Sequence, residues 1–122
     1  MAGVEEAEVG ALPRNFMRAC ILLWLSNNPA HGYDLLERFR TWELEVDPGG
    51  LYRNLRLMEH VGLLSSSWEA SASGPDRRRY ELTAAGSDEL ETWVERLTRM
   101  SLVLDAFLAR HRGGFPGPTQ GR

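Results

Sequence analysis

A row of leucines near the carboxyl end constrains this chain more than any other feature. Leu90, Leu97 and Leu104 stand seven residues apart, with further apolar residues between them, and this heptad spacing is typical of one face of a long helix. We predict a helix from Ala84 to His111, about 40 Å long at 1.5 Å per residue. A domain of this size is too small to cover such a helix, so part of the row is expected to lack a partner within the chain. The predicted dimerisation residues are Leu90, Trp93, Val94, Leu97, Met100, Leu104, Phe107 and Leu108.

A shorter helix with clearly marked ends lies in the middle of the chain. Asp47 is a good N-cap residue, and Pro48 then takes the first helical position, where no N–H partner is needed. Apolar residues recur at helical spacing from Leu51 to Met58. Gly62 suits the left-handed conformation that ends many helices. The stretch therefore predicts one helix of about four turns.

Two further helices are predicted upstream. Residues 16–25 are apolar around most of the circumference, which indicates a helix that is buried on several sides. Residues 27–29, Asn-Asn-Pro, end it. After a turn at His31–Gly32, the apolar residues between Leu35 and Phe39 share one face, which predicts a short amphipathic helix.

Two extended runs follow the central helix. Residues 64–69 alternate between two faces, and residues 79–82 form a second extended run. The segment between them is rich in small residues and contains Gly74 and Pro75. This order predicts a β-hairpin, with the arginines of residues 77–79 at its tip.

The order of these elements predicts the fold class, mainly α with a small β-hairpin. Three short helices, a hairpin and a long helix form a winged helix-turn-helix followed by a long C-terminal dimerisation helix. We predict a disordered arm at residues 1–12 and the winged helix-turn-helix DNA-binding domain at residues 13–83. The dimerisation helix is predicted at residues 84–112, and a disordered Gly/Pro-rich tail at residues 113–122.

The residue types exclude several kinds of chemistry. Cys20 is the single cysteine, which excludes an internal disulfide and a cysteine-rich zinc site. His31, His60 and His111 lack the spacing of metal ligands, so we expect no metal. Gly49–Gly50 is not followed by the Lys-Ser/Thr of a phosphate-binding loop, and no nucleophile–base pair stands out. We therefore predict that the protein is not an enzyme and has no cofactor.

The terminal and apolar segments predict a cytoplasmic protein. No segment approaches the roughly 20 uninterrupted apolar residues of a membrane span. The N-terminus carries Glu5, Glu6 and Glu8, whereas a signal peptide has positive charge at this place.

The charge is unevenly distributed. The net charge is -3, which argues weakly against non-specific coating of nucleic acid. Residues 48–80, however, hold five arginines and three acids. Every basic residue in the chain is arginine, which forms forked contacts to phosphate or guanine better than lysine does.

The helix-turn-helix arrangement gives these arginines a role. The central helix is expected to enter the major groove by its N-terminal end, where glycines let the backbone approach DNA and free N–H groups bind phosphate. The hairpin is expected to reach the flanking backbone or minor groove. The predicted DNA-binding residues are Gly49, Gly50, Tyr52, Arg53, Arg56, Arg77, Arg78 and Arg79.

Two of these assignments have a structural alternative. Tyr52 either donates to a phosphate or packs against the hairpin. The arginine run at 77–79 either binds phosphate or forms a solvated hairpin tip, and Arg79 is a candidate for a purely structural role.

Three segments resemble the PadR transcriptional regulators. Residues 21–39, "ILLWLSNNPAHGYDLLERF", are similar to the first two helices of that family, and residues 48–64, "PGGLYRNLRLMEHVGLL", to its recognition helix. Residues 74–86, "GPDRRRYELTAAG", are similar to its wing and the start of its last helix. The opening "PRNFMRACILL" of residues 13–23 is similar to members labelled poly-hydroxybutyrate-responsive repressors.

The resemblance implies a homodimer that binds operator DNA near promoters and is released by a small effector. In some members, tryptophans at the dimer interface line a pore for flat aromatic compounds, and the corresponding candidates here are Trp24, Trp93, Met17 and Leu97. Plain core packing is the alternative role for these residues. The chain departs from the family at Gly50, where Ser is common, and at Arg53, where Pro is common. Its last helix is short, as in the compact members.

The sequence thus predicts a homodimeric, DNA-binding transcriptional regulator, a repressor that a small-molecule effector releases from a near-palindromic operator. The alternative is a winged-helix module that binds a protein partner, with incidental DNA binding. The acidic net charge slightly favours this alternative.

Overall fold

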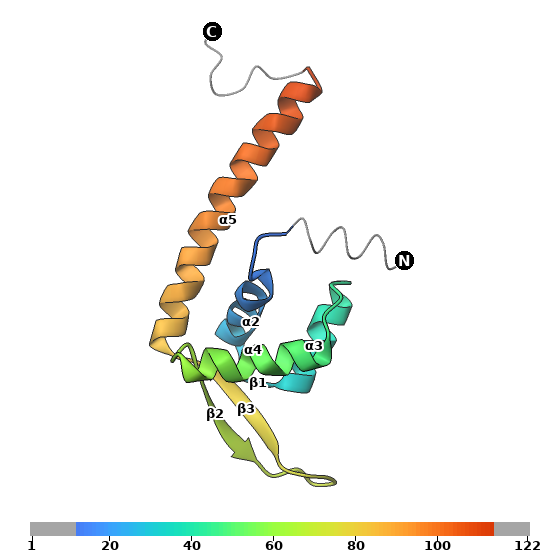
Figure 1. Ribbon diagram of the computed structural model, residues 1–122, viewed down its shortest axis with the longest axis vertical. Helices are drawn as coiled ribbons and strands as arrows, with labels where there is room; N and C mark the ends of the chain where they lie inside the picture. Colours follow the sequence, from blue (N-terminus) through green and yellow to red (C-terminus); the bar gives the residue numbers. More distant parts are fainter. Residues whose placement is uncertain (1–11, 114–122) are drawn as a thin grey trace. The chain divides into compact units, whose positions relative to one another are not determined.

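The structure, a computed structural model, describes residues 12–113. The predicted arm and tail lie outside these residues, except for Leu12 and Gly113. Along the chain, the elements are α2 (Phe16–Asn27), β1 (Ala30–His31), α3 (Gly32–Thr41), α4 (Pro48–His60), β2 (Leu64–Glu69), β3 (Arg77–Leu82) and α5 (Ala84–His111) (Figure 1). The predicted fold class, a winged helix-turn-helix with a long C-terminal helix, is confirmed.

The chain divides into two compact units, Met1–Leu90 and Glu91–Arg122. The first unit contains α2, α3, α4, the sheet and the first residues of α5, and the rest of α5 belongs to the second unit. The core of the first unit draws on every one of its long elements. Its most deeply buried side chains are Ile21, Leu22, Leu35, Phe39, Leu51, Leu55, Met58 and Leu64.

Helix α2 is buried on several sides, as its apolar composition predicts. The ring of Trp24 meets the rings of Phe39 and Trp42 edge to face, with centroids 4.6 and 5.3 Å apart. Cys20 is buried, and this burial raises the pKa of its thiol to about 11 because the thiolate is disfavoured away from water. The cysteine is therefore a core thiol, as expected.

Helix α4 begins and ends where the sequence predicts. The carboxylate of Asp47 accepts a hydrogen bond of 2.9 Å from the Gly50 N–H, and Pro48 occupies the first turn. Gly62 has a φ of +89°, a left-handed conformation that glycine adopts without a steric penalty. The strand β2 begins two residues later, so the glycine turns the chain directly from α4 into the hairpin.

The sheet has one strand more than the predicted hairpin. The three strands are antiparallel in the order β1-β3-β2, and Ala30 and His31 of β1 pair with Tyr80 and Arg79 of β3. The prediction of a plain turn at His31–Gly32 was therefore wrong. A strand of two residues has no periodicity, and it exists only because the edge of β3 offers it hydrogen-bond partners.

The start of α5 is fixed to the end of α4. Thr83 caps the helix by accepting a hydrogen bond of 3.0 Å from the Gly86 N–H, and its hydroxyl donates to the Gly62 carbonyl at 2.6 Å. A Cβ on Gly86 would overlap the carbonyl oxygen of Leu63. The close approach of these two backbones therefore requires glycine at this position.

The second unit carries an exposed apolar surface along α5. Trp93 is only 5% exposed, and the guanidinium of Arg96 lies 4.3 Å from the centre of its ring. No helix among residues 12–113 is long and apolar enough to span a membrane. The exposed large apolar side chains of α5 are Val94, Met100, Leu102, Val103, Leu104, Phe107 and Leu108.

Candidate nucleic-acid interface

The N-terminal end of α4 combines a glycine pair with an arginine. A Cβ on Gly49 would lie 3.4 Å from Nη1 of Arg53, and one on Gly50 would lie 3.6 Å from Nη2. The Arg53 side chain therefore folds back over the glycines and remains exposed. The Asp47 carboxylate already accepts from the Gly50 N–H at this end of the helix, so the Arg53 guanidinium is the group at this tip that is suited to a phosphate.

Arg56 lies one turn further along α4 and is also exposed. It belongs to a group of charged and polar side chains around Tyr80 of β3. Burial raises the pKa of the Tyr80 hydroxyl, the charges of Arg78 and Arg56 lower it, and Glu59 raises it. Arg56 and Glu59 of α4 therefore lie close enough to Tyr80 of β3 to influence the pKa of its hydroxyl.

Tyr52 is half-buried because its ring packs on α3. A Cβ on Gly32 would overlap the ring of Tyr52, so this glycine makes room for the tyrosine where α3 and α4 meet. Its ring thus has a packing role against the start of α3. A contact between the Tyr52 hydroxyl and DNA stays a prediction.

The three arginines of the wing point to different partners. Arg77 is exposed, and within the described part of the chain its side chain has no hydrogen bond or ion pair. Arg78 donates from Nε to the hydroxyl of Ser66 at 2.9 Å, on the sheet face of Tyr80. Arg79 lies on the opposite face and donates to Glu81 at 3.2 Å. The run is therefore not a uniform basic tip, and Arg77 is the arginine best placed for an external anion.

A polar chain that the sequence did not predict joins α4 to the wing. The Ser66 hydroxyl accepts from Arg78 and donates to Glu59 of α4 at 2.7 Å. Ser66 and Glu59 stand on separate elements, seven residues apart across the Gly62 turn. No local pattern signals this contact, since it depends on how the turn folds β2 back along α4.

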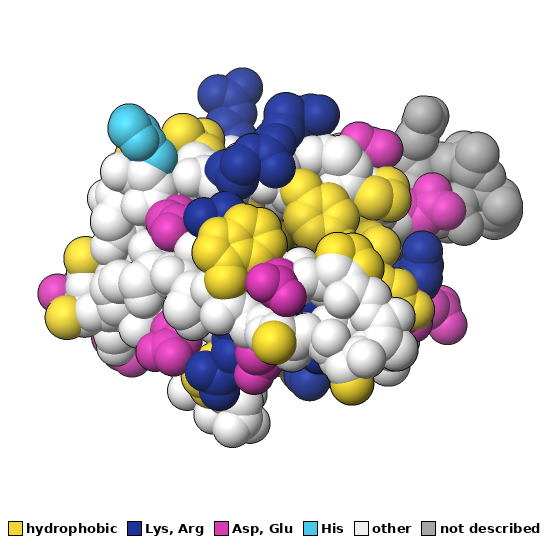
Figure 2. All heavy atoms as spheres, turned by 90° about the horizontal axis from the view of Figure 1, so that it is seen from below, with side chains coloured by type: hydrophobic (Ala, Val, Ile, Leu, Met, Phe, Trp, Pro, Cys, Tyr) yellow, Lys and Arg dark blue, Asp and Glu magenta, His cyan; other side chains and the backbone are white. Residues whose placement is uncertain are grey.

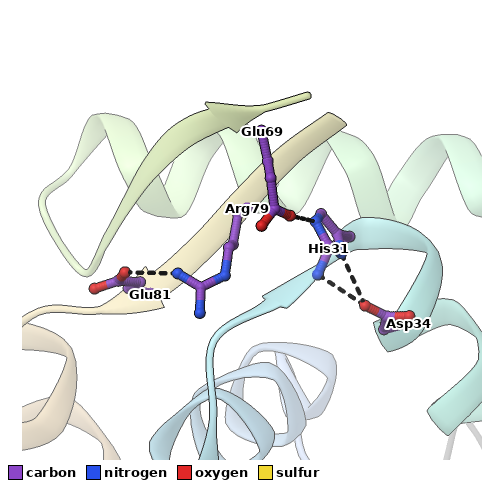
Figure 3. A network of polar contacts seen from close by, with 5 residues as sticks. All are labelled: His31, Asp34, Glu69, Arg79 and Glu81. Carbon is purple, nitrogen blue, oxygen red and sulfur yellow. Dashed lines mark hydrogen bonds and ion pairs between the residues drawn. The ribbon is translucent and has the colours of Figure 1, made fainter. Parts of the chain in front are cut away.

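A second polar cluster joins α3 to the hairpin (Figure 3). Nε2 of His31 lies 2.5 Å from a carboxylate oxygen of Glu69, and its Nδ1 lies 3.2 Å from Asp34. The His31 N–H also donates to Asp34 at 3.1 Å, which caps α3. His31 therefore links the start of α3 to the end of β2, which differs from the turn role that the sequence predicted.

The surface at the hairpin end of the first unit is partly basic. Figure 2, seen from below, shows several arginine side chains gathered beside a group of hydrophobic side chains, with acidic side chains spread around them. Basic and apolar groups are therefore both available to a ligand on this face.

The candidate effector residues are divided between the two units. Trp24 is committed to the aromatic contacts with Phe39 and Trp42. Met17 lines a groove of about 510 Å³ between the start of α2 and the segment before α4. Trp93 and Leu97 belong to the second unit. Their role toward an effector stays a prediction. Among residues 12–113, no group of three or more His, Cys, Asp or Glu side chains is placed to hold a metal ion.

Comparison with protein families decides the classification. The family described as transcriptional regulator PadR-like matches residues 21–92, which include α3, α4, the whole sheet and the start of α5. The chain belongs to this family. The PadR resemblance of the sequence is thereby confirmed, and the protein is a transcriptional regulator and not an enzyme.

Solved structures of PadR proteins share the fold. A PadR family regulator from Clostridium difficile is 26% identical, with 77% of this chain and 99% of that chain aligned and a TM-score of 0.71. A PadR-like factor from Bacteroides fragilis is 28% identical, with 75% and 89% aligned and a TM-score of 0.67. Bacillus subtilis PadR, solved in complex with operator DNA, is 21% identical, with 68% and 48% aligned and a TM-score of 0.62. A search of curated proteins found no match.

Proposed function

We propose that this PadR-family protein is a homodimeric repressor that binds a near-palindromic operator and is released by a small-molecule effector. The observation that carries the DNA-binding part is the exposed pair Arg53 and Arg56 along α4, with the exposed Arg77 on the adjoining wing. In helix-turn-helix proteins the corresponding helix enters the major groove by its N-terminal residues. The proposed contacts are Gly49, Gly50, Tyr52, Arg53, Arg56 and the wing arginines Arg77, Arg78 and Arg79.

The wing arginines have unequal parts in this proposal. Arg77 contacts a phosphate directly, because its guanidinium has no partner in the described part of the chain. Arg78 is already held by Ser66, and Arg79 by Glu81. These two contribute mainly positive potential near the DNA.

Dimerisation is supported by the apolar row of α5. Leu104, Phe107 and Leu108 are 56%, 71% and 46% exposed, and a contiguous apolar surface of this kind marks an interaction site. A two-fold axis between two copies relates their α4 helices, which then meet successive major grooves about 34 Å apart. The operator is therefore expected to be near-palindromic.

Effector release is supported by the family resemblance alone. The proposed lining residues are Trp24, Trp93, Met17 and Leu97, at the interface between two copies. A thermal-shift screen with phenolic acids, planar drugs and nucleotide signals tests this part. A compound that raises the melting temperature of the protein and releases it from the operator identifies the effector class. The proposal also includes a cytoplasmic location.

A salt titration tests operator binding. Six to eight phosphates neutralised per dimer give a slope of log affinity against log salt of about -5 to -7. Arg56→Ala is expected to weaken binding by about 1–3 kcal/mol if the side chain contacts a base. Arg99→Ala removes the same charge from an exposed position on α5 and is the matched control. A flat salt dependence, or equal affinities of the two variants, contradicts the proposed interface.

The alternative, a module for a protein partner, predicts a different result in the same titration. It has the net charge of -3 in its favour. A protein of that kind binds duplex DNA weakly and without preference for the region upstream of its own gene, so a gel shift with that region separates the two functions.

A further inference from the structure

Trp68 is an exposed aromatic side chain with no part in the polar contacts between α4 and the wing. It is 63% exposed, more than any other large apolar side chain among the described residues of the first unit. It stands next to the end of β2, where Trp68 pairs with Arg78 and Glu69 pairs with Arg77. The indole therefore shares a face of the wing with Arg78, whereas Arg77 points to the opposite face of the hairpin.

The indole is held in place from one side. The guanidinium carbon of Arg78 lies 4.7 Å from the centre of the Trp68 ring, a cation–π distance. The same arginine donates to Ser66, which donates to Glu59 of α4. A continuous set of contacts thus runs from Glu59, in the last turn of α4, through the wing to Trp68.

A role in stabilising the hairpin does not explain why the Trp68 side chain leaves so much of its surface exposed. A cross-strand pair such as Trp68–Arg78 contributes to sheet stability, but here most of the indole surface remains in water. An aliphatic side chain would cover Arg78 without leaving so large an apolar area exposed. A ring that is pre-ordered and still exposed is suited to a ligand, because little side-chain entropy is lost when it binds.

We propose that Trp68 contacts operator DNA, with its ring packed on deoxyribose groups at the edge of the minor groove that flanks the major groove entered by α4. This inference rests on the proposed function. Sugar atoms offer apolar surface to the indole, and the indole N–H can donate to a neighbouring phosphate. Arg77, on the opposite face of the hairpin, binds a separate phosphate in this proposal, so the wing makes one ionic and one non-ionic contact.

The two kinds of contact respond differently to salt. The probe is a duplex selected from random-sequence DNA by the full-length chain, titrated at several salt concentrations. Trp68→Ala is expected to lower affinity at least about fivefold with an unchanged slope, because an apolar contact releases no counterion. Arg77→Ala is expected to lower the magnitude of the slope by about 0.9 for each phosphate that the variant no longer neutralises. Val61→Ala removes another exposed apolar side chain, beyond the far end of α4, and should leave both quantities unchanged.

Fluorescence gives an independent readout. Trp24 and Trp93 are 5% exposed and Trp42 is 51% exposed, so acrylamide quenches Trp68 most readily. The selected duplex should protect part of the emission from quenching, and Trp68→Phe should abolish that protection while Trp42 still responds. Wild-type affinity in Trp68→Ala, or protection that persists in Trp68→Phe, overturns this inference alone. A wild-type chain that selects no duplex overturns the proposed function and this inference together.

Discussion

Replacing Phe107 by alanine tests the role of α5 most directly. The Phe107 side chain is 71% exposed, which leaves about 140 Å² of a side chain of roughly 200 Å² available to a partner. At about 25 cal/mol per Å², full burial is worth about 3.5 kcal/mol, and alanine retains part of it. We expect a loss of about 2–3 kcal/mol for each protomer, or about 5 kcal/mol for a symmetric dimer. The dimer dissociation constant should therefore rise by at least about 10³-fold.

Sedimentation equilibrium from nanomolar to micromolar concentration measures this change. Glu95→Ala is the matched control, because Glu95 is exposed on the same helix but lies off the heptad row. Circular dichroism should show equal helix content in both variants. A wild-type chain that is monomeric at micromolar concentration, or a Phe107→Ala variant that dimerises as tightly as Glu95→Ala, would refute the reasoning.

Two further predictions concern stability. Gly86→Ala should lower the free energy of unfolding in urea by about 1–3 kcal/mol, because its Cβ overlaps the Leu63 carbonyl. Gly74→Ala, whose Cβ would lie 3.9 Å from Ser71 Oγ, should cost far less, and equal losses would argue against this close approach. Burial raises the pKa of the Cys20 thiol from 9.0 to about 11. The thiol of the unfolded chain therefore loses its proton at a lower pH than the thiol of the folded chain, and the free energy of unfolding falls as pH rises from 9 to 11. By pH 10 the loss is about 1.4 kcal/mol, and the same urea titrations on Cys20→Ala should lack this part of the pH dependence.

Local sequence signals predicted most of the elements, because each signal acts over one or two turns. Asp47, Pro48 and Gly62 satisfy or end the hydrogen bonds of a single helix, so the bounds of α4 were predictable without the rest of the fold. The heptad row likewise predicted α5 from Ala84 to His111, the bounds observed in the structure. The PadR resemblance rested on the same segments and was confirmed.

Contacts between distant residues were decided by the way the chain folds. The strand β1 has two residues and forms only on the edge of β3. The arginine run at 77–79 looked like one basic tip, yet strand alternation sends Arg78 to Ser66 and Arg79 to Glu81. A side chain's partner depends on which backbone stands opposite, and that depends on how the Gly62 turn places β2 along α4. The order of residues was therefore enough to predict the helices, most of their ends and the family. Which wing arginines form contacts within the chain was decided only by the folded structure, because those contacts depend on the strand pairing.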